Sequence, residues 1–429
     1  MTDTMTIPDT TGTDVFEDRE SVVRSYCRNW PVVFDRASGA EQVTEDGDRY
    51  LDFFSGAGAL NYGHNHPALK TALLDYLSED RVVHSLDMFT VAKRDFLRAF
   101  EETVLRPRGL DYRVQLPGPT GTNAVETALK IARKATGRTD VVSFTNAFHG
   151  MTLGSLAVTG NSMKRAGAGT PLYHSSTAPY DDYLDGSTPD FAWLERVWAD
   201  GGSGLALPAA VIVETVQGEG GLNAARPEWL RALADLCARF GVLLIVDDVQ
   251  AGCGRTGRFF SFEEAGIVPD IVCLSKSLSG LGLPFSVTLL KPELDLWEPG
   301  EHNGTFRGFN PAFVTATAAL REFWSDDTFA AQVRERGAQL RTGLEQISAR
   351  VPGSAYRGRG LLAGLRFEDP TLAGRVATEA FDQHLLVETS GADSEVVKVM
   401  PPLTVTAAEL QRGLDILDRS VRSVLAVAA

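Results

Sequence analysis

The chain has 429 residues, of which 44% are hydrophobic and 23% charged. This composition is typical of a globular protein, and no long uncharged apolar stretch suggests a membrane span. The net charge of -15 argues against a nucleic-acid partner, because affinity for nucleic acid depends on clustered lysines and arginines that neutralise phosphates. We therefore expect a small-molecule partner.

The start of the chain, Met1 to Pro8, is polar and lacks the basic flank and apolar centre of a signal peptide, so we expect a cytoplasmic protein. Cys27, Cys237, Cys253 and Cys273 are scattered, without a pair at metal-ligand spacing. Reduced thiols and no metal site are expected. The length exceeds that of a usual single core, which favours one large domain plus a smaller one.

The first predicted elements form a small N-terminal lobe. Val15 to Asn29 has helical apolar spacing, and short strands are expected at Trp30–Phe34 and Tyr50–Phe54 around the Asp46-Gly47 turn. Gly56-Ala57-Gly58 follows these strands. Because it lacks the full dinucleotide pattern and its βαβ context, we interpret it as a substrate loop.

From about Pro117 the signals for strand and helix alternate, which predicts an α/β fold with a mainly parallel sheet covered by helices. Short runs rich in Val and Ile indicate strands, and apolar residues at helical spacing indicate helices. The expected elements are helix Ala124–Lys134, strands Val141–Phe144 and Ala209–Val213, helix Glu228–Phe240, and strands beginning at Val242 and Ile271.

After Arg307 the pattern changes to a long helical span, and the sequence predicts a C-terminal α+β domain that packs with the N-terminal lobe. The expected elements are helix Phe313–Ala349, strands Leu361–Phe367 and Val396–Met400, and a closing helix Ala407–Leu425. We expect residues 1–60 and 313–429 to form the small domain, and residues 61–312 the large one.

Two of the predicted strands are followed by a charged side chain, Asp247 in one case and Lys276 in the other. Because the carboxyl ends of parallel strands meet at one sheet edge, where α/β enzymes bind ligands, we expect both side chains there. An aspartate facing a pyridine nitrogen and a lysine able to form an imine are what pyridoxal phosphate chemistry requires. Taken alone, an aspartate at a strand end is more often a helix cap, and that alternative stays open.

A turn rich in Gly, Pro and Thr, Leu116 to Ala124, leads into an alanine-rich helix. Free backbone N–H groups and hydroxyls then collect at a helix N-terminus, which favours binding of a phosphate. An ordinary capped helix is the alternative for the loop taken alone, but its occurrence together with Asp247 and Lys276 favours the phosphate site.

Further motifs resemble the class III, or subgroup II, pyridoxal-phosphate aminotransferases over nearly the whole chain. These motifs are Asp52-Phe53-Phe54-Ser55-Gly56, Gly63-His64-Asn65-His66-Pro67, Phe148-His149-Gly150, Gln217-Gly218-Glu219, Asp247-Asp248-Val249-Gln250 and Ser275-Lys276. Within this class the chain looks most like the diaminobutyrate:2-oxoglutarate aminotransferases of ectoine biosynthesis. The resemblance implies fold type I, with a seven-stranded sheet in the large domain and a small α+β domain built from both termini.

The resemblance also implies roles for individual residues. Lys276 would hold pyridoxal 5'-phosphate covalently and, once displaced by substrate, move a proton between substrate and cofactor. Asp247 would keep the pyridine nitrogen protonated. Phe148 and Val249 would cover the two faces of the ring, and Gln250 would bind its phenolic oxygen.

Gly121 and Thr122 would hold the phosphate from their own subunit, and Thr305 would reach it from the neighbouring subunit. The smallest complete unit would then be a homodimer with active sites at the subunit interface. His149 and Glu214 are further candidates for contact with the cofactor, although a structural role for His149 stays open.

Two substrates must share this site, an ω-amine and 2-oxoglutarate. In related ornithine-type enzymes, a glutamate at the position of Glu219 masks an arginine until the oxo acid arrives. Here Lys398 takes the place of that arginine. Because a lysine cannot form the two parallel hydrogen bonds that an arginine forms with a carboxylate, Arg307 or Asn303 would have to help orient the acid. The hypothesis is a Glu219–Lys398 switch; a surface lysine is the alternative.

The leading hypothesis is transfer of the 4-amino group between L-2,4-diaminobutyrate and 2-oxoglutarate, giving aspartate 4-semialdehyde and glutamate. Leu281 and Phe309 depart from the residues that the ectoine enzymes commonly carry. Another donor such as ornithine, 4-aminobutyrate or putrescine, or a paralogue in siderophore or peptide metabolism, therefore stays open. An aminomutase and a noncatalytic homologue are the remaining alternatives.

Overall fold

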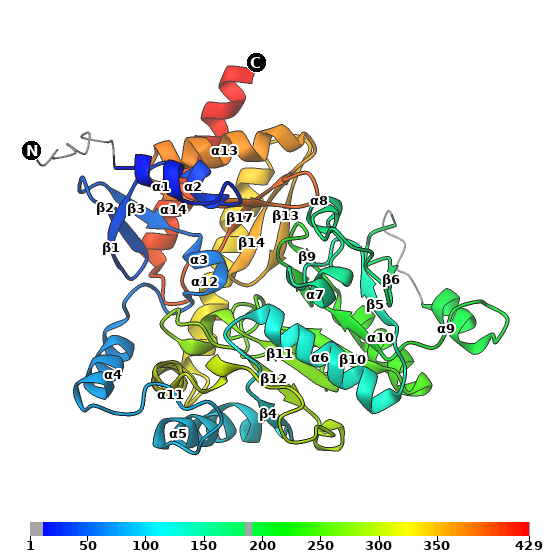
Figure 1. Cartoon of the computed structure of the whole chain (residues 1–429). Coiled ribbons are helices and arrows are strands. Elements are labelled where there is room, and N and C mark those ends of the chain that lie inside the picture. Colours follow the sequence, from blue (N-terminus) through cyan, green and yellow to red (C-terminus); the bar gives the residue numbers. More distant parts are fainter. Residues whose placement is uncertain (1–11, 185–190, 429) are drawn as a thin grey trace, which may run out of the picture.

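A seven-stranded sheet forms the centre of the larger part of the molecule (Figure 1). The computed structural model describes residues 12–184 and 191–428. The strands of this sheet are β4 (Arg113–Gln115), β5 (Val141–Phe144), β6 (Ser175–Ala178), β7 (Ala210–Val213), β10 (Leu243–Asp247), β11 (Ile271–Leu274) and β12 (Val287–Leu290). Their order is β4-β12-β11-β10-β7-β5-β6, and β12 is the one strand that runs opposite to the other six. The predicted mainly parallel sheet is confirmed.

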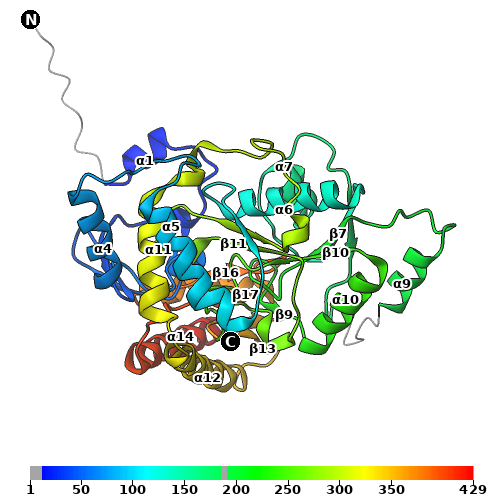
Figure 2. The same cartoon turned by 90° about the horizontal axis from the view of Figure 1, so that it is seen from below.

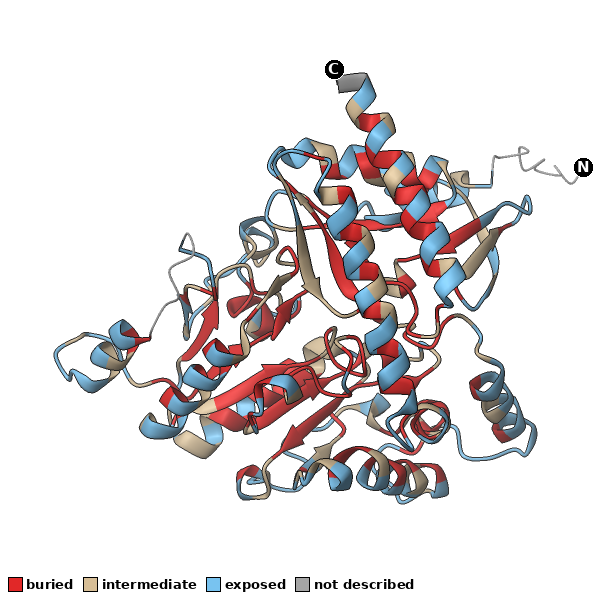
Figure 3. Ribbon diagram, turned by 180° about the vertical axis from the view of Figure 1, so that it is seen from behind, coloured by how far each residue is buried: buried red, intermediate tan, exposed pale blue. Residues whose placement is uncertain are grey.

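Alternate side chains of these strands point to opposite faces, as the period of two requires. Val141, Ile212, Ile245 and Ile271 pack with the apolar face of helix α6 (Gly121–Thr136). The intervening residues of the same strands belong to the core on the other face, which includes helix α10 (Pro227–Phe240). The strands are accordingly buried, whereas the covering helices alternate between buried and exposed residues (Figure 3).

Most other helices of this part lie around the sheet, as the view from below shows (Figure 2). They are α4 (Pro67–Ser78), α5 (Val91–Phe100), α7 (Leu153–Ala157), α8 (Ser162–Ala166), α9 (Ala192–Ala199) and α11 (Asn310–Phe323). Shorter elements are α3 (Ser55–Gly58), β8 (Val216–Gln217), β9 (Asn223–Ala224), the π-helix η1 (Glu101–Leu105), and the 3-10 helices η2 (Arg106–Arg108), η3 (Glu263–Ala265), η4 (Lys276–Ser279), η5 (Pro292–Leu294) and η6 (Thr305–Gly308). No described helix is long and apolar enough to cross a membrane.

The two ends of the chain form the second part of the molecule. Its helices are α1 (Asp14–Arg19), α2 (Tyr26–Asn29), α12 (Thr328–Ser348), α13 (Pro370–Asp382) and α14 (Ala407–Ala428). Its strands are β1 (Phe34–Ser38), β2 (Glu41–Thr44), β3 (Arg49–Asp52), β13 (Ser354–Arg359), β14 (Leu362–Phe367), β15 (Leu385–Leu386), β16 (Glu388–Ser390) and β17 (Val396–Val399). Because β15 pairs in parallel with β3, the N-terminal lobe and the C-terminal region share a sheet.

The elements near the termini differ from their prediction in detail. The helix expected from Val15 to Asn29 is broken into α1 and α2, and the strand expected at Trp30–Phe34 begins only at Phe34. The helix expected from Phe313 to Ala349 is interrupted between α11 and α12, where Trp324 turns inward to donate from its Nε1 to the Tyr62 hydroxyl at 2.8 Å. Apolar spacing continues across such a break, so periodicity alone does not reveal it.

The expected domain boundaries near residues 60 and 312 remain a proposal. Helix α11 packs against α4 and α5, which cover the large sheet. We propose that the large domain continues through α11 and that the second part resumes with α12.

Arg255 joins the two parts of the molecule from a completely buried position. Its guanidinium donates to the side-chain oxygen of Asn61 and to the carbonyls of Leu361 and Pro401. Burial lowers the pKa of Arg255 to about 9, against the opposing charge of Asp52. One buried cation thus satisfies acceptors from three distant segments.

We expect Arg255→Met to lower the free energy of unfolding by roughly 3 kcal/mol or more, because each buried acceptor left without a donor costs about 1–3 kcal/mol. The measurement is the urea midpoint of unfolding. Arg258→Met removes the same charge at a nearby exposed position and should leave the midpoint almost unchanged. Equal midpoints for the two variants would contradict this role of Arg255.

Candidate active site

A cavity of about 490 Å³ opens at the carboxyl edge of the central strands. It brings together most of the residues singled out in the sequence, although they are far apart along the chain. The predicted residues that line it are Gly121, Thr122, Phe148, His149, Glu214, Glu219, Asp247, Val249, Gln250 and Lys276.

Asp247 is the last residue of β10, and its carboxylate is almost fully buried. Its Oδ2 lies 2.7 Å from Nδ1 of His149, and its Oδ1 accepts a hydrogen bond from the Val249 amide at 3.1 Å. Burial alone would lower the pKa of His149, but the adjacent Asp247 raises it overall. Asp247 therefore has a fixed orientation toward the cavity, and it does not cap a helix.

Lys276 follows β11 and begins η4 with a φ of 49°, in the left-handed region that a lysine rarely adopts. The hydroxyl of Ser275 donates to the Phe285 carbonyl, and that of Ser277 donates to the Gly58 carbonyl, so both neighbours fix this backbone. Burial lowers the pKa of Lys276, against the opposing effect of Glu219. A lower pKa increases the fraction of neutral, nucleophilic amine at neutral pH.

The N-terminus of α6 forms one wall of the cavity. Thr120 and Asn123 cap this helix reciprocally, which leaves Gly121 and Thr122 facing the cavity. A Cβ atom on Gly121 would lie 2.8 Å from Val249 Cγ1, so a side chain there would collide with the wall. Backbone donors at a helix start, free of side chains, suit an anion such as phosphate.

Glu214 anchors the segment that carries Phe148. Its Oε2 accepts from the Phe148 amide at 2.9 Å, and its Oε1 accepts from the Gly218 amide at 3.3 Å. Burial raises the pKa of Glu214 to about 7. Glu214 thus positions the ring of Phe148, which lines the cavity.

Gln250 spans the floor of the cavity, where its Nε2 donates to the Ala57 carbonyl at 3.0 Å and reaches Glu219 Oε1 at 3.5 Å. Two buried polar atoms of this site, Gln250 Oε1 and His149 Nε2, have no hydrogen-bond partner among the described residues. Since buried polar atoms are normally paired, the site has unused capacity for a polar ligand.

A buried ion cluster closes the cavity on the side of the second domain. Lys398 on β17 is fully buried, and its Nζ lies 2.9 Å from Glu219 Oε1 and 3.1 Å from Glu388 Oε1. Burial would raise the pKa of Glu219, but Lys398 and Lys276 lower it to about 2. Burial raises the pKa of Glu388 despite the same lysine. Lys398 is therefore not a surface lysine, and the pair with Glu219 has the geometry that the switch hypothesis requires.

Sequence analysis missed Glu388. Its only signal is one acidic residue directly after the apolar run Leu385-Leu386-Val387, where a buried strand residue would be expected. A charged side chain inside such a strand requires a buried partner, and Lys398 is that partner.

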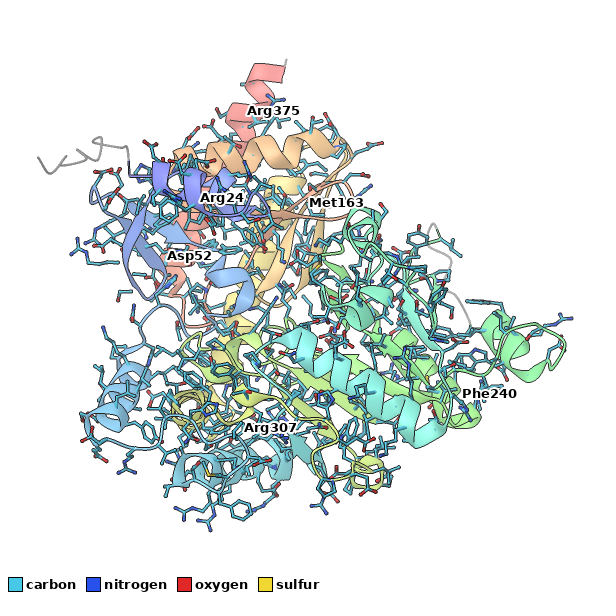
Figure 4. All side chains as sticks on the ribbon, viewed as in Figure 1. Arg24, Asp52, Met163, Phe240, Arg307 and Arg375 are labelled. Carbon is cyan, nitrogen blue, oxygen red and sulfur yellow. The ribbon has the colours of Figure 1, made fainter. Side chains whose placement is uncertain are left out.

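Thr305 and Arg307 lie outside the cavity, on η6. His84 Nε2 is 2.6 Å from the Thr305 carbonyl, and Arg307 donates to Asn303 Oδ1 at 3.1 Å. Figure 4 labels Arg307 on the large domain, in the region where Figure 1 labels β4 and β12. Neither residue contributes to the cavity of its own chain.

Known proteins resemble this chain over almost its full length. The family model of the class III aminotransferases matches residues 23–421. A diaminobutyrate–2-oxoglutarate transaminase from Streptomyces anulatus is 64% identical, with 95% of this chain and 97% of the relative aligned. Enzymes of the same name from Streptomyces coelicolor and Halomonas elongata are 63% and 53% identical, over 98% and 96% of this chain and 99% of each relative.

Among solved structures, an ornithine aminotransferase from Toxoplasma gondii, with pyridoxal phosphate partially occupying its active site, superposes with a TM-score of 0.82. It is 28% identical, and the match covers 97% of this chain and 96% of that chain. Both the family model and the relatives extend across the cavity residues and both parts of the fold. The chain belongs to the class III aminotransferase family.

Proposed function

We propose that this protein transfers the 4-amino group of L-2,4-diaminobutyrate to 2-oxoglutarate, giving aspartate 4-semialdehyde and glutamate. The observation that carries the substrate assignment is the name shared by relatives 53–64% identical over nearly the whole chain. The resemblance to the ectoine enzymes favours ectoine biosynthesis as the pathway.

Pyridoxal 5'-phosphate is the proposed cofactor, and the residues of the cavity fit it. Gly121 and Thr122 would hold its phosphate at the start of α6, where a Cβ atom would fill the cradle. Asp247 would face the pyridine nitrogen, and Gln250, whose Oε1 is buried without a partner among the described residues, would lie beside the ring substituents. Phe148 and Val249 would cover the ring faces.

When bound, the cofactor supplies an electron sink for the carbon that loses its proton. Lys276 would first hold the cofactor and then, displaced by the donor amine, accept the proton from the substrate carbon at Nζ and pass it on to the cofactor. Its lowered pKa suits this role, because a base must be neutral to accept a proton. Asp247, oriented by His149, would hold the proton at the pyridine nitrogen.

Glu219 and Lys398 would adapt the site to its two substrates. While Glu219 and Lys398 are paired, Lys398 is not available to a ligand. The carboxylate of Glu219 faces the cavity, where it can accept a hydrogen bond from the α-ammonium group of the donor. When the oxo acid arrives, its α-carboxylate would replace Glu219 on Lys398. Glu388 keeps Lys398 in place during this exchange.

The proposed complete unit is a homodimer. The segment 82–91 and Phe306 expose large apolar side chains, among them Phe89, which is fully exposed. A patch of this kind is a typical protein interface. Since His84 of this segment contacts the Thr305 carbonyl, the same interface would bring Thr305 and Arg307 to the cavity of a second copy.

Ornithine is the second candidate donor, because the similar solved structure is an ornithine aminotransferase. Ornithine is one methylene longer than diaminobutyrate, and one methylene in a pocket typically changes specificity by roughly 10- to 200-fold. The same cavity would therefore distinguish the two donors clearly.

Titration of the cofactor-loaded protein with diaminobutyrate, without any oxo acid, should shift the visible absorbance of the cofactor, and 2-oxoglutarate should restore it. Ornithine, 4-aminobutyrate and putrescine serve as comparison donors. A larger response to ornithine would select the second candidate. Product formation without any oxo acid would instead indicate a mutase.

Lys276→Ala should abolish covalent attachment of the cofactor, because no other amine of the cavity takes its place. The measurement is the peptide mass after borohydride reduction of the holoenzyme. Wild type and the exposed control Lys70→Ala should carry the added mass on the Lys276 peptide. Labelling of Lys276→Ala at another lysine would refute the assignment.

Lys398→Met should raise the KM for 2-oxoglutarate by about 10-fold or more, the effect of one lost charge-assisted hydrogen bond. The KM for diaminobutyrate should change less. Because the pKa of Glu219 is about 2, below the ordinary glutamate value of 4.5, the ion pair is present above pH 4.5 and weakens only as the pH falls toward 2. The effect of Lys398→Met should therefore be constant between pH 6 and 8, and an unchanged KM for 2-oxoglutarate would exclude the switch.

A further inference from the structure

A third lysine, besides Lys276 and Lys398, lies near the cavity and has no assigned role. Lys164 on α8 is half-buried, and its Nζ lies 4.2 Å from the ring centroid of Phe148, which lines the cavity. Within residues 12–184 and 191–428, no carboxylate forms an ion pair with Lys164. A cation held only by an aromatic ring is free to bind an anion more strongly.

The position of Lys164 is also close to the ion cluster. Its charge contributes to lowering the pKa of Glu219, after the larger effects of burial, Lys398 and Lys276. Met163, its neighbour on α8, lies on the side of the large domain that faces the C-terminal strands (Figure 4). Lys164 therefore lies over the ring of Phe148, close enough to the carboxylate of Glu219 to affect it electrostatically.

Part of the described wall next to Phe148 is apolar. Met151, in the turn that follows His149, lines the cavity with an apolar side chain. Of the other two lysines of this site, Lys276 lines the cavity and is needed at the reacting carbon, and Lys398 is paired with Glu219 and Glu388. Within its own chain Lys164 is thus a cation available to a substrate carboxylate throughout the reaction, in addition to the Arg307 that a second copy would bring.

The two proposed substrates share one geometric feature. In diaminobutyrate, the carboxylate carbon is three bonds from C4, which carries the reacting amine. In 2-oxoglutarate, the distal carboxylate carbon C5 is also three bonds from the reacting carbon C2. One cation at a fixed distance from the reacting centre therefore serves both half-reactions. The substrates differ in their other charged group, the ammonium on C2 of diaminobutyrate and the carboxylate on C2 of 2-oxoglutarate, and the Glu219–Lys398 pair would act on that group.

We infer that Lys164 binds the distal carboxylate common to both substrates and is a specificity residue for them. This inference deepens the proposed function and rests on it. Binding would exchange the contact with Phe148 for a charge-assisted hydrogen bond from Nζ to the carboxylate. Lys164 then selects substrates by the carboxylate they share, whereas Glu219 and Lys398 respond to what distinguishes them.

The first test measures ligand binding without turnover. Glutarate, which has both carboxylates of 2-oxoglutarate, and glutaramide, in which both are neutral amides, are titrated into the holoenzyme by calorimetry. Lys164→Met should weaken glutarate binding by about 10- to 100-fold, the range for one charge-assisted hydrogen bond. Glutaramide binding should change less than about twofold, because it brings no charge to Lys164. Lys164→Arg should restore most of the glutarate affinity.

Methionine can still pack against Phe148, so Lys164→Met separates charge from packing. Lys70→Met removes one charge from an exposed helix position and should leave both affinities unchanged. Equal glutarate affinity in Lys164→Met and wild type would overturn the inference. An equal loss for glutarate and glutaramide would also overturn it, because it would show a general disturbance of the cavity.

The second test compares substrates with and without the distal carboxylate. For Lys164→Met, kcat/KM should fall for diaminobutyrate and 2-oxoglutarate but stay constant for 1,3-diaminopropane and 2-oxobutyrate, which lack that group. If the wild type does not use diaminobutyrate, the proposed donor fails, while the glutarate comparison still decides the role of Lys164. A uniform fall for all four compounds would contradict a specificity role.

Discussion

The register between two parallel strands is the constraint on which the site depends. Asp247 on β10 lies opposite Cys273 on β11, three residues before Lys276. This pairing delivers a carboxylate and an amine to one edge of the sheet. A slip of one residue would turn Asp247 toward the opposite face and place Asp248 at the cavity. The burial of both strands, with apolar helices on each face, fixes the register.

The same alternation separates two adjacent carboxylates. Asp247 faces the cavity, whereas Asp248 is fully buried on the other side, where Ser261 donates to it from both its amide and its hydroxyl. Burial raises the pKa of Asp248 to about 7. Asp248 therefore ties the following loop to the sheet, and Asp247 is the carboxylate available to a ligand.

Polar contacts, rather than apolar ones alone, hold the two parts of the molecule together around the cavity. Lys398 and Glu388 come from the second part, and Glu219 comes from the large domain, so the ion cluster spans the junction. Arg255 spans it again through the carbonyls of Leu361 and Pro401. Removing one partner of such a buried group leaves a charge or an acceptor without compensation, which makes the relative position of the two parts specific. The proposed exchange of Glu219 for a substrate carboxylate keeps this charge balance.

The sequence by itself determined the class of the fold, most of the central strands and helices, and the strand ends that carry Asp247 and Lys276, because short apolar runs and helical spacing are local signals. The turn rich in Gly, Pro and Thr at the start of α6 was an equally local signal. Only the tertiary structure decided that Lys398 is buried between Glu219 and Glu388, and that Lys164 approaches Phe148. These contacts join segments far apart in the chain, and no spacing within the sequence encodes them. The break after α11 was hidden for a related reason: the inward turn of Trp324 depends on Tyr62, a partner that lies in the other half of the chain.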